Sequence, residues 1–340
     1  MKSSVTQNDV AKEAGVTRSM VSYVICGTTD RSVAPETRQR ILDAIEKLGY
    51  RPNKAAQALQ QGDVAFASNK IGVILCNADF FLRPYYSEIL SGIYTAAHEH
   101  NYHISFIRFF DELKDPVLFN TLIHEEEIGG LILLAVDQAI KKEEDRELIK
   151  KIKIRLKKIV CVEWQFEGLS SVMFDRRETA SKATEYLYRE GYNDIVYIGQ
   201  KDERVEGVRQ ILSLHGLNDD PAYYFFAEAF NMAGGASAIE SIPEDGKYPR
   251  AIVCGSDEVA VGVLSVLNKR KIRVPEDVAV IGMDNIEIAE YTNPPLTTMN
   301  VQKKNMGARA VEMIVKNTCG QDDNAIKIML PANIVKGKSA

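Results

Sequence analysis

The sequence predicts an all-α N-terminal domain with a helix-turn-helix, followed by a larger α/β domain in which parallel sheets form two lobes. Two short amphipathic segments joined by Gly15 predict the helix-turn-helix. From residue 71 onward, short apolar runs alternate with helix-like segments, a pattern typical of parallel sheets covered by helices on both faces. A length of 340 residues suits a small domain joined to a two-lobed larger one.

The first predicted helix starts at a capping-box-like pair, Thr6 as N-cap and Asp9 three residues later. An apolar face follows at helical spacing, made of Val10, Ala11 and Ala14. Gly15 then stands where the chain must turn sharply, because glycine accepts a positive φ without strain. Thr17 is a candidate N-cap for a second helix.

The second predicted helix turns Val21 and Val24 inward. Its outward positions are then Arg18, Ser19, Ser22 and Tyr23. In a DNA-binding helix-turn-helix, the N-terminal residues of the second helix contact base edges in the major groove. Arginine pairs bidentately with guanine, and serine bonds several bases. The alternative is an ordinary helical hairpin with exposed polar residues, because short motifs specify function loosely.

A third helix and an unusual polar segment complete the N-terminal region. Pro35 suits the first helical position, and Glu36 suits the positive end of the helix dipole. The helix ends at Gly49, and its expected core stripe is Ile41, Leu42, Ile45 and Leu48. Residues 51–59 then form a helix-capable segment with few apolar anchors, which would not remain helical alone.

Charge is distributed unevenly along the chain. The net charge is −5, yet residues 1–61 hold nine Lys and Arg against six Asp and Glu, which leaves −8 for the remainder. This asymmetry fits a DNA-binding head on a body that does not bind DNA. Five widely spaced cysteines form neither a disulfide framework nor a metal motif, and three of them lie in apolar runs as expected buried thiols: Cys76, Cys161 and Cys254.

Several N-terminal motifs together resemble the LacI/GalR family of bacterial transcription regulators. The matching residues are Asp9-Val10-Ala11, Ala14-Gly15-Val16, Val21-Ser22, Gly27, Glu36-Thr37-Arg38, Gly49-Tyr50, Pro52-Asn53, Ala56 and Leu59. The resemblance implies an N-terminal helix-turn-helix domain over 1–50, a hinge helix over 51–61 and a linker over 62–70. It also implies a homodimer that binds a near-palindromic operator.

The resemblance implies two sets of DNA contacts. In the helix-turn-helix the implied residues are Thr6, Thr17, Arg18, Ser19, Ser22 and Tyr23. In the hinge they are Asn53, Ala56 and Leu59. Leu59 matches a residue that wedges into the central base step in the minor groove and kinks the duplex. Without the resemblance, Leu59 would be interpreted as a packing residue.

The chain departs from the family pattern at four N-terminal positions. Met20 replaces a common Thr, Tyr23 a frequent Arg or His, Cys26 the usual Asn, and Ala34 a frequent Ser. These departures concern which operator is bound, not the mode of binding. We expect Arg18, Ser19 and Tyr23 to set the base preference.

The larger domain, 71–340, is also similar to the family, whose effector-binding and dimerisation core is like a periplasmic sugar-binding protein. Matching stretches are 190–198, 204–207, 274–284, 294–298 and 330–336. The implied chain crosses between lobes three times, with a first lobe of about 71–170 and 297–322 and a second of about 171–293 and 323–340. Expected strands are 71–76, 104–110, 130–135, 159–162, 171–174, 195–198, 223–226, 251–254 and 278–281. Expected helices are 86–101, 118–127, 142–153, 179–190, 204–214 and 259–270.

Candidate effector residues follow from the same resemblance. Arg204 matches an arginine that bonds ligand hydroxyls or a carboxylate, and its planar fork suits such groups. Asp284 matches a strand-end aspartate that accepts bonds from hydroxyls. Ser256 stands where the family usually has Asn, which leaves the ligand's identity open. Neighbouring Asp257 is expected to cap the following helix, and Asp175 has a similar interpretation.

Aromatic residues near the expected cleft have two interpretations. Trp164, the only tryptophan, follows a predicted strand and either stacks on a sugar ring or packs in the core. Phe81 and Tyr85 lie in the loop after the first strand, close to the family's cleft, where most aromatics are expected to be core.

These observations predict a transcriptional regulator, expected to be a repressor, that a small molecule such as a sugar controls. The alternative is control by a partner protein such as a phosphocarrier. No dinucleotide, phosphate-loop, metal-ligand or nucleophile-elbow motif is present, so we expect neither an enzyme nor a cofactor. No signal peptide and no apolar run long enough to span a membrane are present, and we expect a cytoplasmic protein.

Overall fold

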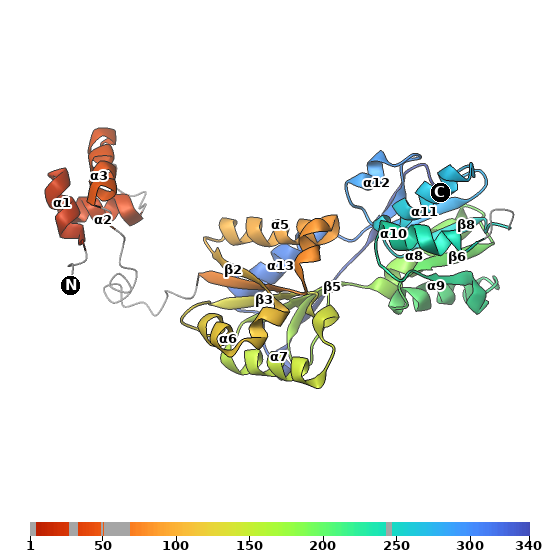
Figure 1. Ribbon diagram of the computed structural model, residues 1–340, viewed down its shortest axis with the longest axis horizontal. Coiled ribbons are helices and arrows are strands. Elements are labelled where there is room, and N and C mark those ends of the chain that lie inside the picture. The colour runs from red at the N-terminus through yellow and green to blue at the C-terminus, as the bar shows by residue number, and fades with distance from the viewer. Residues whose placement is uncertain (1–4, 27–32, 49, 51–68, 243–246) are drawn as a thin grey trace. The chain divides into compact units, whose positions relative to one another are not determined.

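A computed structural model describes residues 5–26, 33–48, 50, 69–242 and 247–340 of the chain (Figure 1). The chain divides into two compact units, residues 1–68 and 69–340. The predicted hinge and linker, including Asn53, Ala56 and Leu59, lie outside the described residues. Among the described residues, no helix is long and apolar enough to cross a membrane.

The small unit contains three helices, α1 (Gln7–Ala14), α2 (Arg18–Cys26) and α3 (Pro35–Leu48). The predicted capping box is present at α1, because Thr6 accepts from the Asp9 backbone N–H and the Asp9 carboxylate accepts from the Thr6 backbone N–H at 2.8 Å. Gly15 ends α1 in the left-handed conformation at φ 63°. Thr17 Oγ1 accepts from Met20 N at 3.4 Å, as expected of an N-cap for α2.

Small and aliphatic side chains form the core of this unit. Its buried members are Val10, Ala11, Ala14, Val21, Ile41, Ala44 and Tyr50. Leu42, predicted to belong to the core stripe of the third helix, is instead 43% exposed. It follows Ile41 directly, and two consecutive positions of a helix do not share one face.

The large unit contains two six-stranded sheets. The first has the order β11-β5-β4-β3-β1-β2, and all of its strand pairs are parallel. Its strands are β1 (Lys70–Leu75), β2 (His103–Phe109), β3 (Gly130–Leu134), β4 (Ile159–Val162), β5 (Ser170–Phe174) and β11 (Lys327–Leu330). The expectation of buried, continuously apolar strands is confirmed for β3 and β4, in which every residue is buried.

The second sheet has the order β12-β10-β9-β8-β6-β7 and is parallel except at β12, which pairs antiparallel with β10. Its strands are β6 (Ile195–Gly199), β7 (Tyr224–Phe226), β8 (Ala251–Cys254), β9 (Ala279–Asp284), β10 (Thr297–Asn300) and β12 (Asn333–Val335). The pairing of β10 and β12 is short, with three matched positions from Thr298 to Asn300.

Helices cover both faces of each sheet. In the first lobe, α5 (Pro84–Glu99) packs beside α13 (Lys303–Val315), while α6 (Pro116–Leu122) and α7 (Glu143–Arg155) lie on the opposite face (Figure 1). In the second lobe, α8 (Arg176–Arg189) pairs with α9 (Glu203–Leu214), and α10 (Met232–Glu240) with α11 (Asp257–Lys269). The shorter elements are α12 (Ile288–Tyr291), η1 (Ala78–Leu82), η2 (Phe110–Lys114), η3 (Val136–Ala139), η4 (Pro221–Tyr223) and η5 (Asp322–Asn324).

The chain passes between the two sheets three times, after β5, after β10 and after β11. The expected lobe boundaries need correction at each crossing. Residues 171–174 extend the first sheet, because β5 pairs with β4. Residues 297–300 belong to the second sheet, through pairing of β10 with β9, and 327–330 return to the first beside β5. The sequence patterns predicted the positions of many strands and helices, but they did not indicate to which of the two sheets a strand belongs.

Helices α10 and α13 were not among the expected elements. Glycines within them weaken the local helix signal, since glycine lowers helix propensity by about 1 kcal/mol relative to alanine. Their role is close packing. A Cβ at Gly307 of α13 would overlap the backbone carbonyl of Ile89 in α5, and one at Gly235 of α10 would overlap that of Val259 in α11.

Candidate functional site

The small unit presents the N-terminal turn of α2 to solvent. Arg18 and Ser19 are exposed, whereas Ser22 and Tyr23 are half-buried. Arg18 Nε donates to Gln7 Oε1 at 3.4 Å, which links the first residue of α2 to the start of α1. Met20, one of the departures from the family pattern, is 41% exposed on the same turn. The surface predicted to face DNA therefore combines a guanidinium, a hydroxyl and a thioether.

Thr6 and Thr17, also predicted to contact DNA, are both exposed caps. The Thr6 hydroxyl donates to Asp9 Oδ2 at 2.7 Å, and this bond leaves the hydroxyl oxygen at the surface. Both hydroxyls lie at helix N-termini, where backbone N–H groups favour anions such as phosphate oxygens. The two threonines that cap the helices therefore also expose hydroxyl groups suited to contacts with the DNA backbone.

A polar cleft of about 490 Å³ lies between the two lobes of the large unit. It is lined from the first lobe by residues that follow β1, β3 and β4, and from the second lobe by residues that follow β6 and end β9. Ligands bind at the carboxyl ends of strands in such open parallel sheets. The lining residues are Cys76, Asn77, Arg83, Tyr85, Tyr86, Asp137, Gln138, Lys141, Glu163, Arg176, Gln200, Asp202, Glu203, Arg204, Phe230 and Asp284.

Three of the six predicted effector residues line this cleft, namely Tyr85, Arg204 and Asp284. The other three do not. Ser256 is fully buried, and its Oγ accepts from Val259 N at 3.2 Å as the N-cap of α11. Trp164 is a core residue whose Nε1 donates to Leu133 O at 2.8 Å. Phe81 is 48% exposed and packs edge-on against Phe109.

Three buried polar atoms of residues that line the cleft have no hydrogen-bond partner among the described residues. They are Arg204 Nε, Glu163 Oε1 and Tyr85 Oη, on side chains of residues that are about 4–6% exposed. A buried polar group without a partner costs about 1–3 kcal/mol. These atoms offer a donor, an acceptor and a hydroxyl that can serve as both, so they match a ligand with several hydroxyl groups.

Arg204, near the start of α9, is held by its neighbour. Its Nη1 bonds Asp202 Oδ2, and its backbone N–H donates to Asp202 Oδ1 at 3.0 Å. The guanidinium also lies over the Phe230 ring, 5.1 Å from its centroid. Asp202 therefore neutralises and orients the guanidinium, while Nε has no hydrogen-bond partner among the described residues.

Glu163 and Arg176 form a second ion pair in the cleft, and neither residue was predicted from the sequence to bind the effector. Arg176 Nη2 donates to Glu163 O at 2.8 Å and to Glu163 Oε2 at 3.2 Å. Glu163 adopts φ 71° just after β4, an uncommon conformation for a non-glycine residue. The sequence feature that could have indicated Glu163 as a cleft residue is its position directly after an apolar strand.

Burial, together with the nearby Glu163 and Asp284, raises the pKa of Tyr85 well above its usual value.

Buried charges also meet at the end of β9. Lys303 of α13 is 3% exposed and bonds the Asp284 carbonyl and, at 3.0 Å, the Asn285 carbonyl. Its ammonium lies 3.5 Å from Glu88 Oε1 of α5. Burial and the nearby Asp257 raise the pKa of Asp284 well above its usual value, although Arg204 and Lys303 act in the opposite direction. Lys303 thus connects the first-lobe helices to a cleft-lining strand of the second lobe.

Asp257 does not cap α11 as expected, because Ser256 does. The buried Asp257 carboxylate accepts from Thr298 Oγ1 at 2.5 Å and from Ile286 N at 2.9 Å, tying α11 to the segments after β9 and in β10. Burial raises the pKa of Asp257 to about 7. The capping interpretation of Asp175 is confirmed, since its Oδ1 accepts from Glu178 N at 2.8 Å at the start of α8.

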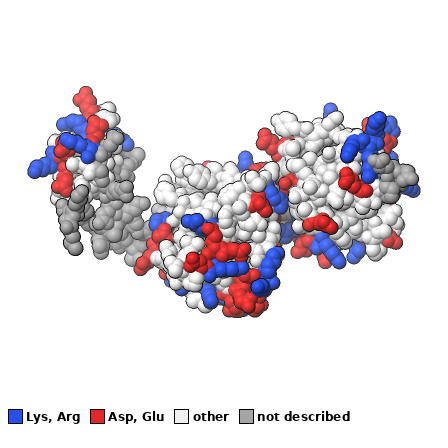
Figure 2. Space-filling model, viewed as in Figure 1, with Lys and Arg blue, Asp and Glu red and all other residues white. Residues whose placement is uncertain are grey.

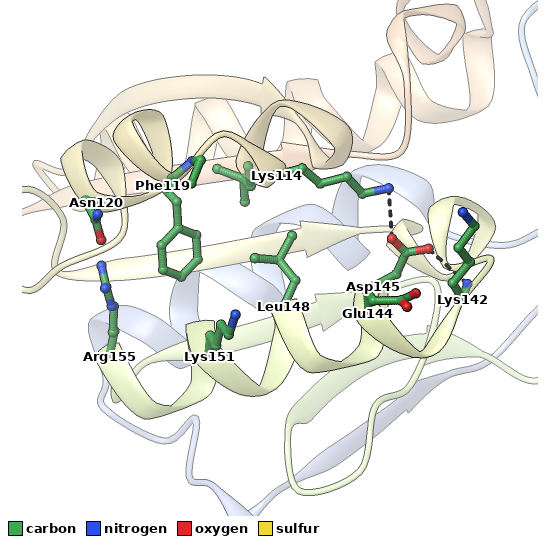
Figure 3. A pocket seen from close by; sticks show the side chains of 11 residues that line it. Lys114, Phe119, Asn120, Lys142, Glu144, Asp145, Leu148, Lys151 and Arg155 are labelled. Carbon is green, nitrogen blue, oxygen red and sulfur yellow. Dashed lines mark hydrogen bonds and ion pairs between the residues drawn. The ribbon is translucent and has the colours of Figure 1, made fainter.

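A second hollow, of about 620 Å³, lies on the first lobe between α6 and α7. Figure 3 shows Phe119 and Leu148 at its floor, with Lys142, Lys151 and Arg155 around it. In the same view Lys114 reaches across to Asp145, at 2.8 Å. This hollow therefore joins an apolar floor to a mainly cationic rim.

Within the ranges that the structure describes, no group of three or more metal-ligating side chains is present. The cysteines predicted as buried thiols, Cys76, Cys161 and Cys254, are buried, and so is Cys319. Burial raises the pKa of all four thiols. Protonated, buried thiols are poor nucleophiles and poor metal ligands.

Comparisons with known proteins agree with this architecture. Residues 6–53 match the family of bacterial regulatory proteins, lacI family, and residues 184–340 match the periplasmic binding protein-like domain. The chain is 30% identical to the ribose operon repressor of Escherichia coli (strain K12), over 91% of this chain and 92% of that protein. It is 28% identical to the HTH-type transcriptional repressor PurR of Aliivibrio fischeri (strain MJ11), over 93% of each.

A solved structure shows the same fold over the whole length. The lac repressor dimer bound to operator and the anti-inducer ONPF aligns with a TM-score of 0.75 and 21% identity, over 99% of each chain. A helix-turn-helix unit joined to a two-lobed, binding-protein-like domain defines a class of DNA-binding regulators rather than enzymes. This chain belongs to the lacI family of bacterial regulatory proteins.

Proposed function

We propose that this regulator is a repressor whose operator binding is controlled by an uncharged polyhydroxy compound, a sugar or sugar derivative, in the interlobe cleft. The observation that carries the proposal is the set of three unpartnered buried atoms, Arg204 Nε, Glu163 Oε1 and Tyr85 Oη. Two ion pairs among the cleft-lining residues are formed within the protein, Arg204 with Asp202 and Arg176 with Glu163. A neutral ligand with several hydroxyls satisfies the open positions without adding an unpaired charge.

Asp284 supports the same ligand class. It is 4% exposed at the end of β9, and its raised pKa means that burial favours the protonated carboxyl. A carboxyl in that state donates one hydrogen bond and accepts others, which suits a ligand hydroxyl. The names of the ribose operon repressor and of a CelR-cellobiose complex, similar at 24% identity and TM-score 0.67, support a carbohydrate.

Calorimetric titration of the full chain with a panel of neutral pentoses, hexoses and disaccharides tests this assignment. We expect one class of compound to bind the wild type and to lose about tenfold or more in affinity in Arg204→Ala, which removes charge-assisted bonds. Arg177→Ala is the matched control, because Arg177 is exposed and bonds Gln210 on the surface of the same lobe. Equal loss in both variants would exclude Arg204 from the site.

For DNA we propose a homodimer that places two α2 helices in successive major-groove half-sites of a near-palindromic operator. Arg18, Ser19, Ser22 and Tyr23 would contact base edges, and Thr6 and Thr17 phosphates. Selection of bound duplexes from a random pool tests this mode. Two inverted half-sites with a fixed spacing are expected, whereas a single half-site would contradict dimeric binding.

A face of the first lobe suits dimerisation. Figure 2 shows few charged side chains over the part of this lobe that carries α5. On α5, Ser91, Tyr94 and Thr95 are exposed, and Tyr94 is 67% exposed. An exposed tyrosine among small uncharged residues is typical of an interface core. Tyr94→Glu should raise the fraction of monomer in sedimentation analysis, and an unchanged dimer would remove this face from the interface.

The hinge proposal rests on Leu59, together with Asn53 and Ala56 in the minor groove, all outside the described residues. If Leu59 inserts between base pairs, Leu59→Ala removes the wedge and reduces DNA bending, with an effector affinity close to that of the wild type. Bending is measured by resonance energy transfer between dyes at the two ends of the selected operator. An unchanged bend in the variant would overturn the wedge assignment.

Control by a partner protein such as a phosphocarrier is the second candidate, and the hollow between α6 and α7 favours it. Its apolar floor and its rim of Lys142, Lys151 and Arg155 complement an acidic or phosphorylated protein surface. Binding of a phosphocarrier protein that is lost in Lys151→Glu, together with no heat from the carbohydrate panel, would favour this candidate over the first.

A further inference from the structure

Arg83 connects the two lobes at the cleft. It immediately precedes α5 in the first lobe, and its guanidinium reaches Glu258 in α11 of the second lobe. Arg83 Nε and Nη2 both donate to Glu258 Oε2, at 2.9 and 2.7 Å. Nη2 also donates to the Phe230 carbonyl at 2.9 Å. One side chain thus makes three hydrogen bonds across the cleft to two separate segments of the other lobe.

The first-lobe side of this contact is well supported. Asn77 caps η1, which ends at Leu82, and the backbone N–H of the C-cap residue Arg83 donates to Phe80 O at 3.4 Å. Ser87 Oγ donates back to Arg83 O at 3.1 Å, which ties the residue to the first turn of α5. The guanidinium lies 5.2 Å from the centroid of the Tyr86 ring. Arg83 is therefore held at its base rather than extended freely from a loop.

The partner of Arg83 in the second lobe, Glu258, is also held in place. The Glu258 side chain is 9% exposed, and Arg83 is the cation that pairs with it among the described residues. Without Arg83, a buried carboxylate would lack its counter-ion, which is strongly unfavourable. Burial thus makes the Arg83–Glu258 pair more than a weak surface ion pair.

Phe230 extends the effect of this contact into the effector site. Its carbonyl accepts from Arg83, and the centroid of its ring lies 5.9 Å from the guanidinium of Arg83 and 5.1 Å from that of Arg204. Phe230 also lines the cleft. A first-lobe residue therefore positions the aromatic ring against which the second lobe orients Arg204.

We propose that Arg83 is an interlobe bridge that holds the two lobes together across the cleft and positions Phe230 beneath Arg204. A ligand that closes two lobes must otherwise supply the free energy of closure from its own contacts. If the bridge already favours the closed form, the binding-competent fraction is larger and the apparent effector affinity is higher. The inference concerns the ligand-free chain, so its test does not depend on the identity of the effector.

Hydrogen exchange of the ligand-free full chain, followed by mass spectrometry, tests the bridge. In Arg83→Met we expect amides at both walls of the cleft, in 137–141 and 200–205, to exchange about tenfold faster than in the wild type. These segments line the cleft but do not bond Arg83. Faster exchange there reports separation of the lobes rather than loosening around the substituted residue.

Two further variants guard against a misleading result. Arg273→Met removes a different arginine–carboxylate pair, with Asp277, that lies within one lobe and should leave cleft exchange unchanged. Glu258→Gln keeps the size of the partner side chain and removes its charge, so an intermediate increase is expected even if Arg83→Met folds poorly. Faster exchange confined to 78–86, with 137–141 and 200–205 unchanged in both bridge variants, would overturn the proposal.

Discussion

The small unit buries aliphatic side chains and exposes its polar ones, whereas the interlobe cleft buries arginines, carboxylates and a tyrosine hydroxyl. In the small unit, Val10 and Ile41 are fully buried while Arg18 and Ser19 are exposed. In the cleft, Arg204, Glu163 and Asp284 are each at most about 5% exposed. DNA is a large charged surface that an exposed helix can reach, but a small neutral ligand must be enclosed and matched atom by atom.

This difference implies that different kinds of substitution destabilise the two regions. The small unit depends on a few aliphatic contacts, so a loss of packing should unfold it as a whole. The large unit has extensive cores around its sheets, and its sensitive points are buried charges. The following variants separate these two kinds of dependence.

The largest effect is expected from Ile41→Ala in the small unit. Deleting a fully buried isoleucine side chain typically costs about 2–5 kcal/mol, much of the stability that so small a domain can have. Operator binding should be lost, while thermal unfolding followed by Trp164 fluorescence should not change, because the only tryptophan lies in the large unit. Leu42→Ala is the matched control at an exposed position and should bind operator normally. Equal behaviour of the two variants would contradict the described core.

The second prediction concerns pH and Asp257. Its pKa of about 7 means that the folded chain keeps this proton between about pH 4 and 7, where the unfolded chain has lost it. Stability of the large unit should therefore fall as the pH rises through this range and then level off. Denaturant unfolding at several pH values, followed by Trp164 fluorescence, measures this dependence.

Asp257→Asn should weaken that dependence, to which the raised pKa of Asp284 also contributes, and make the large unit more stable than the wild type at pH 8. Asp277→Asn is a control of opposite sign, because Arg273 lowers the pKa of Asp277 to about 2. The contribution of Asp277 is lost only as the pH falls below about 4. A wild-type stability that rises from pH 4 to 7 would contradict the buried, protonated Asp257.

Lys303→Met tests the connection between α13 and the cleft strand, with a smaller expected effect. Removing the ammonium leaves the carbonyls of Asp284 and Asn285 without this donor, a cost of about 1–3 kcal/mol. Lys304→Met is the matched control, because Lys304 is the exposed neighbour in the same helix. Denaturant unfolding of the two variants should differ, and indistinguishable curves would show that Lys303 does not support the strand end.

The smallest effect is expected at the cap of α1. Thr6→Ala removes the side chain that accepts from the Asp9 backbone N–H, and loss of such a cap costs about 1 kcal/mol. Circular dichroism should show a lower melting temperature of the small unit, and Thr6→Ser should restore it. A Thr6→Ala melt identical to the wild type would show that the capping box is unimportant here.

Elements fixed by neighbouring residues could be predicted from the sequence, whereas elements fixed by tertiary contacts could not. The capping box at Thr6, the turn at Gly15 and the strands β4 and β8 follow from neighbouring residues, so local patterns located them. Strand β10 pairs in the sheet opposite to the expected one, and only tertiary contacts decide that choice. Helices α10 and α13 were not predicted, because their glycines lower the local helix propensity. These glycines allow close packing between helices.

Only some of the cleft-lining residues could be predicted from the sequence, again because tertiary contacts bring the others together. Arg204 and Asp284 lie in motifs that a family resemblance identifies, and both line the cleft. Glu163 and Arg176 carry no such motif, and Arg83 and Glu258 are 175 positions apart in the chain. The reverse error occurred at Trp164 and Ser256, whose polar atoms satisfy internal hydrogen bonds. The sequence alone does not distinguish a polar group aimed at a ligand from one used in the core.

The most direct test of the account joins its two regions in one titration. Fluorescence anisotropy of the selected operator duplex is measured with and without the neutral carbohydrate that binds in calorimetry. Because coupling between two sites typically amounts to about 5–150-fold, we expect a change of this size in operator affinity for the wild type. No change is expected for Arg204→Ala. An operator affinity that no carbohydrate alters, or an effect that persists in Arg204→Ala, would contradict control of DNA binding from the interlobe cleft.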